Sequence, residues 1–143
     1  MKTIILRTIA MLMGIAVLFA VSGCEDSDDS ADERDYLPRP GDEELTKGPV
    51  YINSADLLML KTYPPKYNVL IKGALPTPCH SWRAVVNPPN EAQKIDVDVY
   101  SLVDPNVVCI QVLVNFEGSV EIPNPPPGRY EVRVNGKSAG FIE

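Results

Sequence analysis

The sequence has 143 residues, a formal net charge of −6 at neutral pH and an isoelectric point of about 4.8. This length allows one domain of ordinary size and leaves no room for a second. Nucleic acid is excluded as a partner, because binding to phosphates needs a basic surface and this chain is acidic. The lone histidine, His80, excludes the usual metal sites, which combine several histidine or cysteine ligands, and no cofactor is expected.

The first 24 residues have the three parts of an export signal. Lys2 and Arg7 give a short positive region, residues 9–21 form an apolar run, and small residues lead to Cys24. The stretch Val21-Ser22-Gly23-Cys24 resembles the lipobox at the end of a bacterial lipoprotein signal peptide. The resemblance implies cleavage after residue 23, a diacylglycerol on the sulfur of Cys24 and a further fatty acid, such as palmitate, on its amino group. It implies a place in the bacterial cell envelope, where the lipid on Cys24 holds the chain to the membrane.

Two other interpretations of this segment stay open. One is a transmembrane anchor, although the apolar run is well short of the roughly 20 residues that a spanning helix needs. The other is an ordinary cleaved signal, which would leave Cys24 as an odd cysteine because Cys79 and Cys109 can pair with each other. A lipidated cysteine agrees best with both observations.

Residues 24–46 are predicted to form a disordered acidic tether. Ten of the acidic residues of the chain lie here against two arginines, and large apolar side chains are nearly absent. Self-repelling charge should keep such a segment extended, so it acts as a spacer between membrane and domain. An alternative is that the acidic run after Cys24 carries sorting information, which favours the outer membrane or cell surface over the inner membrane.

Residues 47–143 are predicted to form an all-β, immunoglobulin-like sandwich of about seven short strands. Apolar runs alternate with turns that contain most of the 14 prolines, at the spacing typical of sandwiches. The pattern in 95–99 places three branched residues inward and two carboxylates outward, and the apolar stretch 107–116 is predicted to be a central strand covered on both faces. Residues 56–61 can be one helical turn or a strand. The other expected strands are 50–52, 67–72, 82–86, 120–122, 130–134 and 137–142.

The end of the chain carries a hairpin signature. Residues 130–134 alternate between apolar and polar, and Asn135-Gly136 is the favoured two-residue turn. The segment from Pro127-Gly128 to this turn is similar to the last hairpin of many bacterial immunoglobulin-like modules. This resemblance concerns the architecture and implies no activity.

Cys79 and Cys109 are predicted to form a disulfide, because an exported chain folds in an oxidising compartment. The bond would fasten a loop to the sheet and stabilise the domain by roughly 3 to 4 kcal/mol in the chain-entropy model. The alternative is a reactive thiol with His80 as its base. Adjacent residues on an extended segment point to opposite sides, so His80 cannot easily activate Cys79.

The candidate binding residues lie in two loops. His80, Trp82 and Arg83 belong to residues 77–83, and Arg129 ends the proline-rich segment 124–129. Trp82 is expected to pack on the disulfide or to be an exposed contact for a sugar or protein. The carboxylates Asp96 and Asp98 are interpreted as a solvated strand face, and so are Glu131 and Arg133, which are expected to pair across strands. The function expected is therefore a lipid-anchored, non-enzymatic module that binds an envelope protein or glycan; the alternative is a small envelope enzyme with a cysteine and histidine site.

Overall fold

A computed structural model of the chain describes residues 35–143, so the predicted signal segment and residues 24–34 of the predicted acidic tether, Cys24 included, lie outside the described residues. Within this part, no helix has the length and apolar character needed to cross a membrane. The elements in chain order are η1 (Asp42–Glu44), β1 (Thr46–Gly48), β2 (Tyr51–Leu60), β3 (Lys66–Leu75), β4 (Ser81–Val86), β5 (Lys94–Val103), β6 (Val114–Ile122), β7 (Tyr130–Val134) and β8 (Lys137–Ile142).

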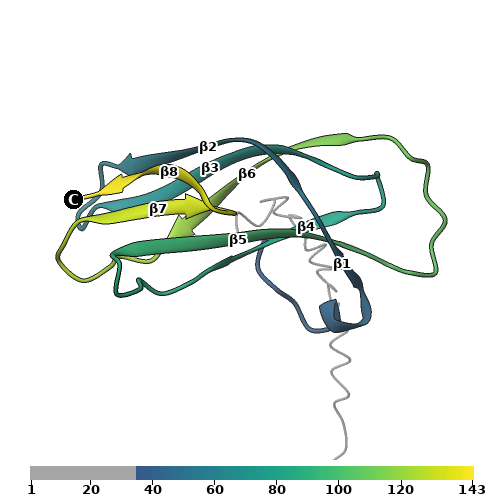
Figure 1. Cartoon of the computed structure of the whole chain (residues 1–143), viewed down its shortest axis with the longest axis horizontal. Helices are drawn as coiled ribbons and strands as arrows, with labels where there is room; N and C mark the ends of the chain where they lie inside the picture. The colour runs from purple at the N-terminus through teal and green to yellow at the C-terminus, as the bar shows by residue number, and fades with distance from the viewer. Residues whose placement is uncertain (1–34) are drawn as a thin grey trace, which may run out of the picture.

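The strands form two sheets that pack face to face (Figure 1). The order of the smaller sheet is β2-β3-β6. In the larger sheet β5 is the central strand: β4 pairs along one edge, while β1 and β7 share the other edge and β8 pairs with β7. The pairing of β5 with β7 is parallel and the other pairings are antiparallel. The predicted all-β sandwich is confirmed.

The core lies between the two sheets and follows the alternation read from the sequence. Ile95, Val97 and Val99 of β5 are buried, as expected. They face buried residues of the smaller sheet, such as Val69 and Ile71. Burying an aliphatic side chain of this size contributes about 1.5–3 kcal/mol, so this double layer is the main source of stability.

The one ambiguous stretch resolves as strand and joins the expected strand before it. Residues 50–52 and 56–61 were expected as separate pieces, yet a single strand, β2, covers nearly all of both, with a bulge between Ile52 and Ser54. The predicted hairpin at Asn135-Gly136 is confirmed. Both turn residues have positive φ, 46° and 83°, as a two-residue turn of this kind requires.

The domain begins earlier than the predicted boundary at residue 47. Tyr36 is buried where the edges of β4 and β6 leave the sandwich open. Its carbonyl oxygen accepts a hydrogen bond from the main-chain N–H of Ala84 at 2.8 Å, and its hydroxyl accepts one from Glu121 at 3.1 Å. Residues 35–46, assigned to the tether, are therefore part of the folded domain, because Tyr36 closes the gap between two unpaired strand edges.

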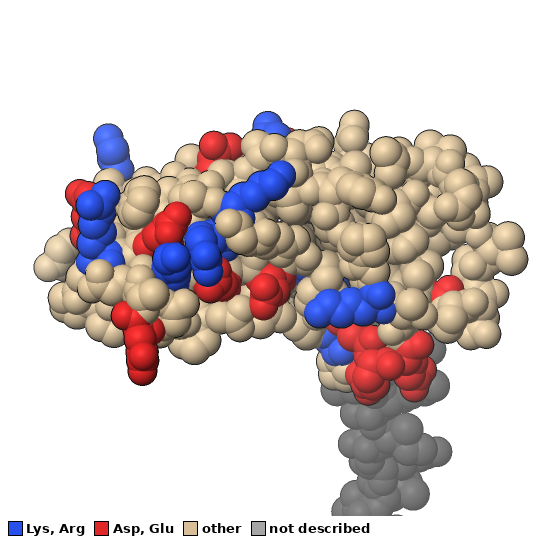
Figure 2. Space-filling view, viewed as in Figure 1, with Lys and Arg blue, Asp and Glu red and all other residues tan. Residues whose placement is uncertain are grey.

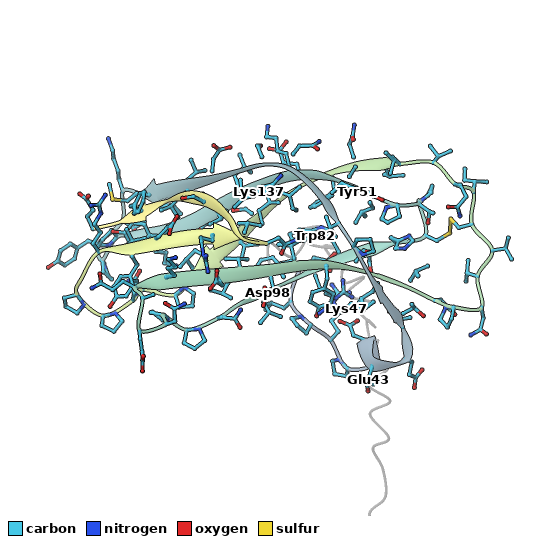
Figure 3. The ribbon with its side chains drawn as sticks, viewed as in Figure 1. Glu43, Lys47, Tyr51, Trp82, Asp98 and Lys137 are labelled. Atoms are coloured by element: carbon cyan, nitrogen blue, oxygen red, sulfur yellow. A yellow bond between two sulfur atoms is a disulfide. The ribbon has the colours of Figure 1, made fainter. Side chains whose placement is uncertain are left out.

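Three aromatic rings line this closed side. Trp82 stacks on Tyr36 with ring centroids 5.8 Å apart and lies against Phe116 at 5.2 Å. Gly118 makes room for the indole, since a Cβ at this position would be 2.2 Å from its Cζ2 atom. The expectation that Trp82 packs on the disulfide is replaced by this aromatic stack. The labelled indole points between the layers in Figure 3.

Candidate binding site

The predicted disulfide between Cys79 and Cys109 is present, with Cα atoms 6.1 Å apart (Figure 3). It joins the β3–β4 loop to the β5–β6 loop, so neither cysteine is a free thiol. Thr77 organises the first of these loops: its hydroxyl lies 2.7 Å from Nδ1 of His80 and accepts a hydrogen bond from the N–H of Cys79 at 3.3 Å. The imidazole of His80, half-buried, is thus held in a structural turn.

The segment that the disulfide fastens is the largest departure from the sequence prediction. Residues 107–116 were expected to be a covered central strand, but β6 begins only at Val114, and the preceding residues form an exposed loop. The exposed fractions of its aliphatic side chains are 48% for Val107, 100% for Val108, 68% for Ile110, 54% for Val112 and 61% for Leu113. We call residues 76–80 and 104–113 together the apolar end.

Charged side chains are almost absent from the apolar end. Its residues include one carboxylate, Asp104, and no lysine or arginine. In the face seen in Figure 2, charged residues gather over the opposite half of the sandwich and over the N-terminal segment. The oxygen Oδ1 of Asp104 accepts hydrogen bonds from the main chain and side chain of Asn106 at 2.8 and 3.1 Å, so this carboxylate shapes the base of the loop.

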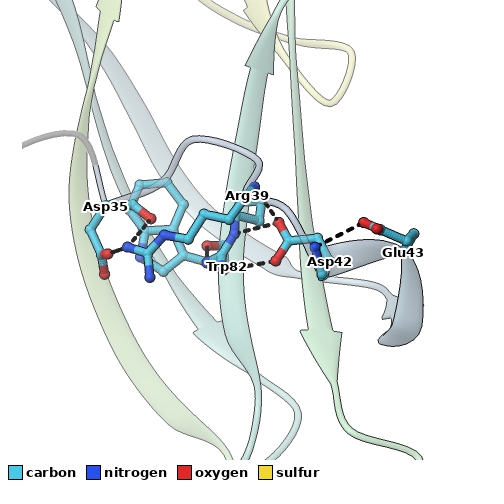
Figure 4. Close-up of polar contacts among 7 residues, drawn as sticks. Asp35, Arg39, Asp42, Glu43 and Trp82 are labelled. Atoms are coloured by element: carbon cyan, nitrogen blue, oxygen red, sulfur yellow. Dashed lines mark hydrogen bonds and ion pairs between the residues drawn. The ribbon is translucent and has the colours of Figure 1, made fainter.

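Arg83 is not a surface contact. Its side chain is buried, and Nε and Nη2 donate to the two carboxylate oxygens of Asp42 at 2.8 and 3.1 Å. Hydrogen bonds from Arg83 and from the N–H of Arg39 hold the pKa of Asp42 below its usual value. Figure 4 shows this group, in which Arg39 also contacts Asp35. The predicted binding role of Arg83 is therefore replaced by a structural one, because the pair fastens the N-terminal segment to β4.

The doubled prolines converge at the end of the molecule opposite the apolar end (Figure 1). Pro64-Pro65 lies between β2 and β3, Pro88-Pro89 between β4 and β5, and residues 125–127 between β6 and β7. Two shallow grooves separate these loops. One of about 320 Å³ is lined by Pro65 and the 124–128 loop, and one of about 270 Å³ by Pro88-Pro89 and residues 123–126.

We call residues 61–65, 87–93 and 123–129 together the proline end. Tyr63 is fully exposed there. Arg129 is also exposed, with its guanidinium 4.6 Å from the ring centroid of Phe141 and 3.7 Å from a carboxylate oxygen of Glu143. Of the four predicted binding residues, Arg129 is thus the one displayed on a loop surface. Tyr63 is one of the aromatic residues that the sequence offers for a binding surface, and the structure shows that its ring is exposed.

The carboxylates of β5 have local partners. Asp96 forms an ion pair with Arg133 of β7, with two hydrogen bonds of 2.8 and 2.9 Å. The outward face of β5 is therefore polar, as expected, and one of its carboxylates is paired with a neighbouring strand. This contact, together with Glu131, raises the pKa of Arg133. Asp98 accepts a hydrogen bond from Asn87 at 2.7 Å. Between residues 35 and 143, no cluster of three or more histidine, cysteine, aspartate or glutamate side chains is placed to hold a metal ion.

The comparisons with known proteins concern the fold. A family model described as the ORF11 beta-sandwich domain matches residues 69–142, which extend from β3 to β8. No curated protein and no solved structure matches the chain.

Proposed function

Starting from the fact that the chain belongs to the ORF11 beta-sandwich domain family, we propose that it is a lipid-anchored module of the bacterial cell envelope that binds a protein or glycan through its proline end. The family description names a fold and no activity. The proposal therefore rests on the surfaces of this chain and on the sequence around Cys24.

The observation that carries the binding surface is the convergence of three doubled-proline loops beside the exposed ring of Tyr63. Proline fixes one backbone angle, so these loops lose little conformational entropy when a partner orders them. Exposed tyrosine and arginine are the residue types that most often dominate binding energy, and Tyr63 and Arg129 supply one of each. A rigid sandwich with its loops at one end is a common way to display such contacts.

The test of this surface is photo-crosslinking in intact cells. A photoreactive phenylalanine analogue replaces Tyr63 in one variant and Tyr51 in a matched control, since both are exposed tyrosines and Tyr51 lies on β2 outside the proline end. We expect an adduct with one envelope component from position 63 and none from position 51. Adducts from position 51 alone would contradict the proposed surface.

The anchor is tested separately. We expect Cys24→Ser to release the protein from the membrane fraction while the domain stays folded. The variant lacks the sulfur that would carry the diacylglycerol, and membrane attachment is firm only with two or three acyl chains. The matched control is Ser27→Ala, which leaves the cysteine in place and should remain membrane-bound. A Cys24→Ser protein that still sediments with membranes and resists extraction would remove the anchor from the proposal.

The alternative, a small envelope enzyme using a cysteine and His80, needs a free thiol. Both cysteines of the domain are bonded to each other, and His80 is engaged with Thr77. A thiol titration of the purified protein decides between the two functions, since an enzyme of this kind requires a reactive thiol under native conditions.

A further inference from the structure

The apolar end has no role in the proposed recognition of a partner, although its surface is almost free of charged side chains. Five aliphatic side chains on a single loop are between half and fully exposed: Val107, Val108, Ile110, Val112 and Leu113. Surfaces of this kind mark sites of interaction with proteins or membranes. We propose that the apolar end inserts these side chains into the surface of the lipid bilayer that holds the anchor, an inference that rests on the lipid-anchored part of the proposed function.

The residue types favour lipid over protein. Binding hot spots between proteins are enriched in tryptophan, tyrosine and arginine and poor in valine and leucine. The 104–113 loop contains none of the first group and is dominated by valine, isoleucine and leucine. These side chains enter hydrocarbon with favourable free energy, and at this loop they have no charged neighbour to desolvate except Asp104 at its base.

The loop is shaped for insertion to a shallow depth. Between Asp104 and Val114 no residue belongs to a strand, so many main-chain groups of this segment need water or another partner. Deep burial would leave these groups unsatisfied in hydrocarbon, whereas the interface lets the side chains pass the headgroups while the main chain stays hydrated. The disulfide at Cys109 and the turn at Asp104 already order the loop, which lowers the entropy lost on insertion.

The tether has sufficient reach. Eleven residue steps separate Cys24 from Asp35, and a chain extends at most about 3.6 Å per residue, so the anchor allows a span of about 40 Å. A ten-residue strand such as β5 is about 33 Å long, so the apolar end can reach the bilayer without strain on the tether. Tethering also raises the effective concentration at the surface to the millimolar range, which turns weak insertion into steady occupancy.

This orientation agrees with the proposed recognition surface. The apolar end and the proline end lie at opposite ends of the long axis of the molecule (Figure 1). Insertion of one end therefore points the other, with Tyr63 and Arg129, away from the bilayer. Because the apolar end has no lysine or arginine, its insertion does not depend on anionic lipids or on salt.

The experiment measures the depth of the loop in the anchored protein. Lipidated mature chain is reconstituted into phosphatidylcholine vesicles whose acyl chains carry bromine, a quencher of tryptophan fluorescence. Ile110→Trp reports on the apolar end, and Met59→Trp is the matched control because the two side chains have similar exposed fractions, 68% and 60%. The unsubstituted chain gives the baseline from Trp82.

We expect the added fluorescence of Ile110→Trp to be quenched and shifted to shorter wavelength, with no quenching for Met59→Trp. Neither added salt nor anionic lipid should change the result. Adding Val108→Asp to Ile110→Trp should abolish the quenching, while adding Gln111→Asp, which alters an already polar position of the loop, should reduce it less. Absence of quenching at position 110 in the anchored chain overturns the proposal, and loss of self-association on Val108→Asp would then identify a second copy as the occupant.

Failure of the anchor is distinguishable from failure of insertion. If the purified mature chain carries no lipid, its flotation with phosphatidylcholine vesicles is measured directly. Flotation that Val108→Asp abolishes would sustain insertion without the anchor. The absence of lipid by itself overturns the anchor, and the absence of flotation would then overturn insertion as well.

Discussion

Gly118 shows how much of the fold depends on one missing side chain. The indole of Trp82 lies so close to the main chain of β6 that a methyl group at position 118 would overlap two of its ring atoms, at 2.2 and 2.4 Å. The indole also stacks on the ring of Tyr36, which itself closes the gap between β4 and β6. Any displacement of the indole would therefore also displace Tyr36.

We accordingly expect Gly118→Ala to lower the free energy of unfolding by about 1–3 kcal/mol, the usual cost of overpacking a well-packed site. Equilibrium urea denaturation measures the change. The neighbouring Glu117→Ala, which removes an exposed ion pair with Lys72, is the control and should cost less than about 1 kcal/mol. Equal losses for the two variants would show that the indole has room to move.

The ion pair between Asp42 and Arg83 should make stability depend on acid pH. The folded state holds the pKa of Asp42 below its usual value of 3.8, chiefly through hydrogen bonds from Arg83. The stabilisation is then fully present above the unfolded pKa, near 4, and is lost as the pH falls through the lower folded pKa. We expect the difference in unfolding free energy between wild type and Asp42→Asn to be constant near neutrality and to shrink below pH of about 4. A difference independent of pH would contradict this assignment.

At the scale of elements, β5 is completed by a turn residue. Its edge is paired with β7 at residues 94–97 and with β1 at residues 101–103, which leaves a gap at Val99. The side chain of Asn135, in the β7–β8 turn, fills this gap: Oδ1 accepts from the N–H of Val99 at 2.8 Å, and Nδ2 donates to its carbonyl at 2.9 Å. An amide side chain thus replaces one residue of a missing strand.

Replacing Asn135 by glycine should keep the turn, because glycine adopts positive φ readily, and should remove both hydrogen bonds. At about 1 kcal/mol for each bond, we expect a loss of about 2 kcal/mol in the free energy of unfolding. Asn135→Asp should lose more, since it places an acceptor against the carbonyl of Val99. Ser138→Ala on the neighbouring strand is the control. If all three variants unfold alike in urea, the side chain of Asn135 does not complete β5.

The same scale shows where the sequence misleads. The alternation in β5 and the Asn-Gly turn identified a strand and a hairpin because side-chain period and turn chemistry are local properties. The apolar run 107–116 was mistaken for a buried strand. An apolar sequence shows that the side chains avoid water, but it does not show which part of the molecule covers them. Cys79 and Cys109 were paired correctly, since two cysteines in one domain leave one choice.

At the scale of the whole molecule, the N-terminal segment is part of the domain. Its average composition predicted disorder, and composition hides single anchoring residues such as Tyr36 and Asp42 among acidic neighbours. For the same reason Arg83 was taken for a binding residue, because its partner lies 41 residues earlier in the chain. The proline end was equally hidden: the sequence shows neighbouring prolines at three separate places, and only the topology brings them to one end.

A chain starting at Asp35 should fold as one cooperative unit, and a chain starting at Lys47 should be destabilised by several kcal/mol. Loss of a buried aromatic side chain alone costs about 3–5 kcal/mol, out of the 5–15 kcal/mol that stabilise an ordinary domain. Urea denaturation of the two chains measures the difference. Tyr36→Phe in the longer chain is the control, since it removes only the hydrogen bond from Glu121 and should cost about 1 kcal/mol. Equal stability of the two chains would return residues 35–46 to the tether.

The domain becomes complete only when β1 and β7 have both paired with the edge of β5 that they share. One half of that edge is paired by β1, the first strand of the described residues, and the other half by β7, near the C-terminus. During synthesis, a chain in which β7 has not yet emerged leaves the edge of β5 beside the apolar core unpaired at residues 94–97. Contacts between such distant parts of a chain form slowly. The nascent protein must therefore avoid aggregation until β7 and β8 have been synthesised. A chaperone that covers β5 would act during that time.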